Sequence, residues 1–252
     1  MPAPIGLQLY SLRESMNQDF QATIEKVAQI GYSGVEIASL PGITPKEAKK
    51  LFDSLGLTVC GTHSQLPLDD KKKDIIETMG ILGNPPLIIP WQPPESFESL
   101  DRIKRLAEIL NKTNEIAKVN GFKIGYHNHH AEMNRIDGKP GLLILSELTH
   151  DDIFFEVDTY WAQTGGVDPV SLIKSLGRRA PFLHLKDGPC VRGEPMTAVG
   201  DGIMEFKPII DAGEEFTKWS IVEIDSCATD MLEAVEKSYQ FITNKGFAYG
   251  RT

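Results

Sequence analysis

The chain has little cysteine and no long apolar run. Its three cysteines, Cys60, Cys190 and Cys227, are odd in number and form no CxxC pair, so a disulfide framework is not expected and a reducing compartment is the simpler prediction. No apolar run approaches the ~20 residues of a membrane-spanning helix. The first residues carry no signal-peptide pattern, and we expect a cytoplasmic protein, although an export signal trimmed ahead of Met1 would leave no trace.

Basic charge is also scarce. Acidic residues outnumber Lys and Arg by 35 to 26, for a net charge of −9, whereas a nucleic-acid binder usually shows a basic footprint. No GxGxxG or GxxxxGK[ST] motif follows any predicted strand. These absences favour a small-molecule partner over a nucleic acid or a membrane. No linker or low-complexity tract divides the sequence, and we expect a single domain over residues 1–252.

Eight short apolar runs recur along the chain, each bounded by Gly, Pro or charge, as buried strands are. They span residues 5–10, 34–38, 57–63, 86–91, 122–128, 152–158, 181–187 and 219–225. Amphipathic helical patterns lie between them, for example over 99–121, and Thr44 before Pro45 and Glu47 is typical of a helix N-cap. Eight strands with interleaved helices in this length predict an α/β fold, the (β/α)₈ TIM barrel. A doubly wound open sheet is the alternative.

Polar side chains stand where the predicted strands end, and the active site of such a barrel lies at that end. Because side chains alternate with a period of two, residues at i and i+2 share a face. Buried charges at the same end of successive strands are costly unless they are paired or bound to metal. The candidates are Glu36, His63, His127 with His129, Glu156 with Asp158, His184 with Lys186, and Glu223 with Asp225.

Several of these segments together resemble a known family. "GVEI", "GYHNHHAEM", "FFEVDTYWAQTGGVDP", "FLHLKDGP", "VGDGIMEF" and "IVEIDS" are similar to xylose isomerase-like barrels, the sugar phosphate isomerases and epimerases, over residues 5 to about 241. The resemblance implies one bound divalent metal, which could be Mn, Zn, Co, Fe or Mg. Mixed nitrogen and oxygen ligands suit most of these metals. Carried over by position, it implies Asp158, His184 and Glu223 as ligands.

The fifth predicted strand departs from the family pattern. Many members have a glutamate there, whereas alignment of the apolar lead-in places His127 at that position. We therefore expect His127 as the fourth ligand, with His129 on the same face as its substitute or as a catalytic group. His130 has the opposite parity and is expected to be a bystander.

This departure bears on the reaction. Family epimerases use two metal-bound carboxylates on opposite sides of the substrate, and here only Glu223 remains as a base unless a histidine replaces the other. Lys186 could stabilise an enolate or transfer a proton if burial lowers its pKa, as the resemblance to keto-inositol dehydratases and keto-sugar lyases suggests. A salt bridge from Lys186 to Glu156 or Glu223 is the structural alternative.

Other strand-end residues are predicted to contact the substrate. Trp161 and Trp91 suit the apolar face of a sugar ring, with rim packing as the alternative. Glu36, His63 and Glu156 are expected to contact hydroxyl groups, although Glu36 could equally pair with a buried base.

The first functional hypothesis is a metal-dependent isomerase or epimerase acting on a small sugar through an enediolate. The alternative is a dehydratase or lyase acting on a keto-sugar or keto-cyclitol through the same enolate. An endonuclease of this fold and a non-catalytic sugar-binding barrel are less favoured, the first because of the −9 charge. Whether the chain forms a homo-oligomer stays open.

Overall fold

The computed structural model describes residues 2–251, which form a closed barrel of parallel strands. Strand β10 pairs with β1, Ser220 opposite Ile5, and this pairing closes the sheet. The predicted TIM barrel is confirmed, and the doubly wound open sheet is wrong. The barrel strands are β1 Ala3–Gln8, β2 Gly34–Ile37, β3 Thr58–His63, β4 Leu87–Ile89, β5 Ile124–His127, β8 Phe154–Asp158, β9 Phe182–Leu185 and β10 Trp219–Val222.

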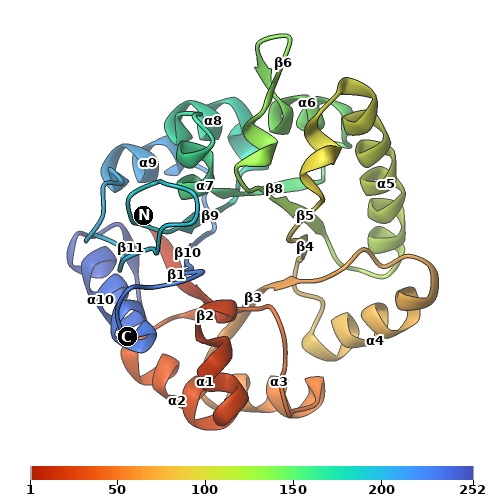
Figure 1. The fold of residues 1–252 in the computed structure, drawn as a ribbon. Helices are drawn as coiled ribbons and strands as arrows, with labels where there is room; N and C mark the ends of the chain where they lie inside the picture. Colours follow the sequence, from red (N-terminus) through yellow and green to blue (C-terminus); the bar gives the residue numbers. More distant parts are fainter. Residues whose placement is uncertain (1, 252) are drawn as a thin grey trace.

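Helices surround the barrel as an outer ring (Figure 1). The α3 helix begins with the predicted cap, because the Thr44 side chain accepts from the Glu47 N–H while the Glu47 carboxylate accepts from the Thr44 N–H. The α-helices are α1 Arg13–Gln18, α2 Phe20–Ile30, α3 Pro45–Ser54, α4 Lys72–Leu82, α5 Leu100–Val119, α6 Gly141–Leu148, α7 Thr159–Thr164, α8 Pro169–Leu176, α9 Phe206–Gly213 and α10 Met231–Asn244.

The barrel interior changes from apolar to polar along its axis. At the N-terminal end of the strands, a separate cluster of Cys60, Ile88, Phe154, Phe182 and Ile221 fills the interior. Because side chains alternate, the next inward positions on β8, β9 and β10 are the polar ones named above. This filled apolar layer forms the base on which the buried charges rest.

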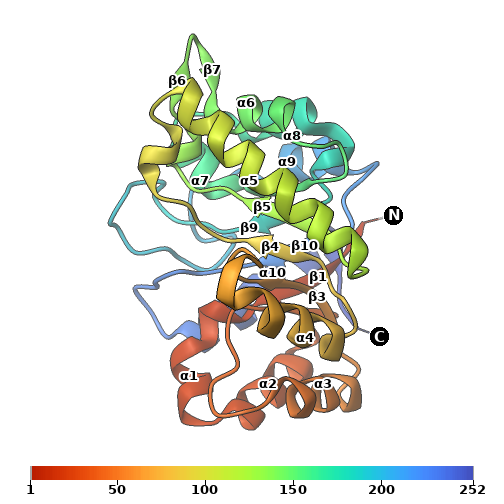
Figure 2. The ribbon, with the colours of Figure 1, turned by 90° about the vertical axis from the view of Figure 1, so that its right-hand side faces the viewer.

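The loops that follow the strands project from one end of the barrel, and both termini lie at the other (Figure 2). A short hairpin, β6 Arg135–Ile136 and β7 Lys139–Pro140, follows β5. Strand β11, Ala248–Tyr249, pairs with the start of β1. No helix in residues 2–251 is both long and apolar enough to cross a membrane.

Candidate active site

The four predicted metal ligands converge at the C-terminal end of the barrel. One ligand atom from each of His127, Asp158, His184 and Glu223 lies within 4.8 Å of the others, and all four residues are buried. His184 Nδ1 is 2.9 Å from Glu223 Oε2, and His127 Nε2 is 3.6 Å from Asp158 Oδ2. Two nitrogen and two oxygen donors at this spacing suit a divalent transition metal.

Asp158 supports this assignment because its two carboxylate oxygens have different surroundings. Oδ1 accepts the Trp161 N–H at 2.8 Å and caps the N-terminus of α7. Oδ2 is buried and makes no hydrogen bond within the described residues, although Lys186 Nζ lies 3.0 Å away. Burial raises the pKa of Asp158 to about 6. This oxygen lies close to donor atoms of the other three candidate ligands, and this set of nitrogen and oxygen donors fits a bound divalent cation.

The Lys186 ammonium lies among three carboxylates. Nζ is 2.7 Å from Glu223 Oε2 and 3.0 Å from Asp225 Oδ2, as well as close to Asp158. Burial alone would lower the pKa of Lys186, but these acids raise it well above its ordinary value. Lys186 is thus a cation here, and the condition stated above for its role in proton transfer, a pKa lowered by burial, is not met in this arrangement. Of the two predicted salt-bridge partners, Glu223 is confirmed, while Glu156 makes no recorded ion pair with Lys186.

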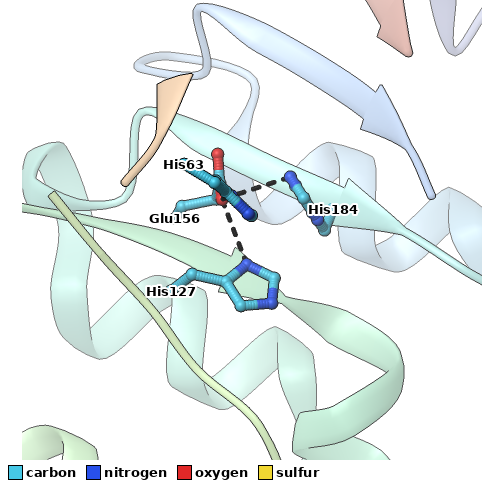
Figure 3. Close-up of side chains that lie close together, drawn as sticks. All are labelled: His63, His127, Glu156 and His184. Carbon is cyan, nitrogen blue, oxygen red and sulfur yellow. Dashed lines mark hydrogen bonds and ion pairs between the residues drawn. The ribbon is translucent and has the colours of Figure 1, made fainter. Parts of the chain in front are cut away.

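Deeper in the barrel, three imidazole rings surround the Glu156 carboxylate (Figure 3). Oε2 lies 2.8 Å from His63 Nε2, 3.0 Å from His127 Nδ1 and 3.2 Å from His184 Nε2. Burial opposes charge on His63, but Glu36 and Glu156 raise its pKa to about 10. Burial, together with the nearby negative charge of Glu36, raises the pKa of Glu156. These residues form a second group, which shares His127 and His184 with the predicted ligand set.

Glu36 belongs to this deeper group. Its Oε2 accepts the Gln8 side-chain N–H at 2.7 Å and lies 2.8 Å from His184 Nε2 and 3.1 Å from His63 Nε2. The predicted alternative that Glu36 pairs with a buried base is therefore what the structure shows. Glu36 and Glu156 are both fully buried and do not line the pocket. Their placement favours a supporting role over direct contact with a substrate.

Above the predicted ligands opens a pocket of about 480 Å³. Its walls combine aromatic rings with histidines and acids, and Trp161 donates from Nε1 to Asp225 Oδ2 at 3.2 Å. The lining includes the predicted contacts His63, Trp91 and Trp161, together with His127, His129 and Glu223. Trp91 is 55 % exposed and stands at the rim.

His129 lies in the pocket wall beside His127, with 5.0 Å between the ring centroids. Burial and the nearby Lys186 charge lower its pKa to about 3, so the ring is neutral. Its Nδ1 is buried and has no hydrogen-bond partner in the described residues. His130 does not line the pocket and packs its ring near Trp161.

Sequence reasoning missed two supporting residues. The Asn128 amide donates to the Asp158 carbonyl and accepts the Asp158 N–H, both at 3.1 Å, and so holds the backbone of a predicted ligand. The buried Glu132 carboxylate accepts the His129 N–H and the Tyr126 hydroxyl. A polar residue directly after an apolar strand was the available signal for Asn128.

A family model described as a xylose isomerase-like TIM barrel matches residues 24–245. The chain belongs to this family. An inosose dehydratase from Histophilus somni (strain 129Pt) is 24 % identical over 287 residues, covering 95 % of this chain and 95 % of that protein. A crystal structure of a sugar phosphate isomerase/epimerase from Parabacteroides distasonis ATCC 8503 superposes with a TM-score of 0.83 and 26 % identity, covering 99 % and 96 % of the two chains. An L-ribulose 3-epimerase structure has a TM-score of 0.70 and 18 % identity, covering 97 % and 94 %.

Proposed function

We propose that this xylose isomerase-like barrel is a metal-dependent enzyme that removes a proton beside the carbonyl of a keto-sugar or keto-cyclitol and then eliminates a leaving group. The observation that carries the proposal is the contact between Glu223, which lines the pocket, and the buried Lys186 behind it, with 2.7 Å between Oε2 and Nζ. This contact places a carboxylate base and an ammonium acid next to each other. The inosose dehydratase relatives are named for a related loss of water.

His127, Asp158, His184 and Glu223 would hold the metal. A divalent ion bound there would polarise the substrate carbonyl and stabilise negative charge on its oxygen. The chain's own groups supply the proton transfers. Glu223 is ionised, because Lys186 and His184 outweigh its burial and hold its pKa below the usual range. It can therefore accept the proton, while the Lys186 ammonium donates to the departing group.

Elimination is favoured over epimerisation because only one carboxylate of the predicted ligand set lines the pocket. Glu223 does so, whereas Asp158 does not, and the position of a second carboxylate base is taken by His127. An epimerase must return the proton to the opposite face of the same carbon. A single carboxylate with an adjacent ammonium suits departure of a group from the neighbouring carbon instead.

Isomerisation or epimerisation, the first hypothesis from the sequence, is the second candidate. Its support is His129, whose neutral ring lies in the pocket wall with an unpaired Nδ1 and could act as the second base. In either case a neutral substrate is favoured. Glu223 and Asp225 line the pocket with Tyr10, Trp91 and Trp161, and these acids would repel a phosphate while the aromatic rings suit a sugar face.

The test is a panel of keto-sugars and keto-cyclitols incubated with metal-loaded protein in deuterated water, with product masses measured. Elimination predicts a product lighter by its leaving group, such as water. An isomer of unchanged composition that has gained solvent deuterium would favour the second candidate. If no panel member reacts or exchanges its proton, the proposed chemistry is contradicted for this substrate class.

A further inference from the structure

Two overlapping groups of candidate ligands share His127 and His184, and each shared ring turns a different nitrogen toward each group. His127 places Nδ1 3.0 Å from Glu156 and Nε2 3.6 Å from Asp158. His184 places Nε2 3.2 Å from Glu156 and Nδ1 2.9 Å from Glu223. The outer group is His127, Asp158, His184 and Glu223, and the inner group is His63, His127, Glu156 and His184.

Imidazole chemistry decides how two such groups can be used. A neutral ring offers one nitrogen as a ligand and keeps an N–H on the other. Metals in both groups would require both shared rings to lose both protons and bridge two cations. The simpler arrangement gives the metal to one group and leaves the second nitrogen of each ring to donate a hydrogen bond.

The contacts favour the outer group as the metal site. Glu156 Oε2 in the inner group already faces three imidazole nitrogens at 2.8–3.2 Å, whereas in the outer group His127 Nε2 and Asp158 Oδ2 stand 3.6 Å apart, which leaves more room for an ion between them. His127 and Glu223 of the outer group also line the pocket, where a substrate can reach them. Glu156 is fully buried below them.

We propose that Glu156 is the positioning residue of the site: its carboxylate accepts an N–H from the metal-binding His127 and from the pocket-lining His63, and it lies 3.2 Å from Nε2 of the metal-binding His184. Glu36 assists from the other side, since it lies 2.8 Å from His184 Nε2 and 3.1 Å from His63 Nε2. Glu156 thereby sets which nitrogen of each ring faces the metal and joins the metal site to the pocket wall. The inference rests on the ligand set of the proposed function, though not on its reaction.

Gly61 on β3 provides the space this arrangement needs. A Cβ added there would stand 2.5 Å from Glu36 Oε1 and 2.8 Å from Ile88 Cδ1. A larger residue at this position would push Glu36 away from the imidazole rings.

The first test measures Mn²⁺ affinity by titration calorimetry for wild type and Glu156→Gln. Loss of a carboxylate that orients metal-binding histidines typically weakens metal affinity by about 10–100-fold, and we expect that loss with one metal still bound per chain. Glu132→Gln is the matched control, because Glu132 is equally buried but accepts from Tyr126 and the His129 backbone rather than from the shared rings. Its Mn²⁺ affinity should stay within about threefold of wild type.

A second pair of variants decides between the two groups even if Glu156→Gln does not fold. Asp158→Asn should weaken Mn²⁺ binding by at least about tenfold, while His63→Gln should keep a stoichiometry of one. Two metals per wild-type chain, with one lost in His63→Gln, would make Glu156 a ligand and overturn the proposal. Unchanged affinity in folded Glu156→Gln would overturn it as well. All of these are binding measurements, so a failed substrate panel would leave the inference standing.

Discussion

At the scale of single residues, the charge of Lys186 is the most costly feature of the barrel interior. The Lys186 side chain is fully buried, and its positive charge is stabilised by the surrounding carboxylates of Asp158, Glu223 and Asp225. A buried ion pair adds little net stability, and removal of one partner leaves the others uncompensated. This arrangement is therefore better explained by chemistry at the pocket floor than by folding.

We predict that Lys186→Met destroys turnover without lowering metal content. Removal of a general acid or base typically costs ~10²–10⁴-fold in rate. Lys186 is also a competing cation at Asp158 and Glu223, so metal binding should not weaken when it is removed. Steady-state kinetics on a verified substrate and elemental analysis provide the two readouts. Retention of most of the wild-type rate would reduce Lys186 to an ion-pair partner and favour the histidine-assisted isomerase.

Glu132 gives a residue-scale prediction in pH. Burial raises its pKa to about 7, against about 4.3 in an unfolded chain. The folded state thus binds the proton more tightly, and this contribution to stability is present below about pH 4 and lost as the pH rises through 7. Glu132→Gln cannot titrate, so its stability relative to wild type should increase by about 3 kcal/mol between pH 4 and pH 8.

Urea unfolding of both proteins across this pH range is the measurement. Titrating groups common to both proteins cancel in the difference. A stability difference that does not change with pH would mean that Glu132 is ionised in the folded protein throughout.

The strand period of two predicted which residues face the barrel interior, and the family resemblance indicated which of these residues are metal ligands. His127, Asp158, His184 and Glu223 converge as that period requires. The direction of the Lys186 pKa shift could not be predicted. It depends on Asp158 and Asp225, which reach Nζ from two neighbouring strand ends, and sequence spacing contains no distances between side chains.

At the scale of elements, the loop after β9 is held by a single carboxylate. Asp187 accepts four backbone N–H groups at 2.8–3.1 Å, from Gly188, Gly200, Gly202 and Met204. Hydrogen bonds to a charged acceptor are the stronger kind. Asp187, which directly follows Lys186 in the sequence, thus connects the start of the loop to its end.

We predict that Asp187→Ala loosens this loop. Four donors would lose their acceptor, and opening should become easier by on the order of 2 kcal/mol. Trypsin cleavage after the exposed Arg192 should then accelerate by roughly tenfold or more. Asp201→Ala is the control, since Asp201 is an exposed acid in the same loop for which no side-chain hydrogen bond is recorded. Equal cleavage rates in both variants would show that Asp187 does not hold the loop.

The regular elements were predictable, and the loops only in part. Seven of the eight apolar runs contain a barrel strand and the first overlaps β1, because buried parallel strands need continuous apolar residues. The segment after β5 contains the β6–β7 hairpin, which was not among the predicted elements. Asp137 and Gly138 form its turn with φ of 50° and 84°, and an Asp-Gly pair is a hairpin signal that could have been used. The hydrogen bonds that Asp187 accepts join residues up to 17 positions apart, beyond any local pattern.

At the scale of the whole molecule, the barrel gathers buried charged groups into one site. An apolar layer closes the bottom, buried acids and histidines lie above it, and an aromatic-walled pocket opens over them. The outer ligand group brings two carboxylates together beside the Lys186 ammonium and the His184 ring. We propose the 252-residue chain as one domain built around a single metal.

The most direct test of that claim is Mn²⁺ binding to Asp158→Asn, measured by calorimetry with elemental analysis. Asparagine is as good an N-cap as aspartate, so α7 should keep its Trp161 hydrogen bond while the site loses a charged ligand. Asp168→Asn, at the N-cap of α8, is the matched control. The account predicts one metal per chain in wild type and in Asp168→Asn, with affinity at least about tenfold weaker in Asp158→Asn. Full occupancy and unchanged affinity in Asp158→Asn would contradict it.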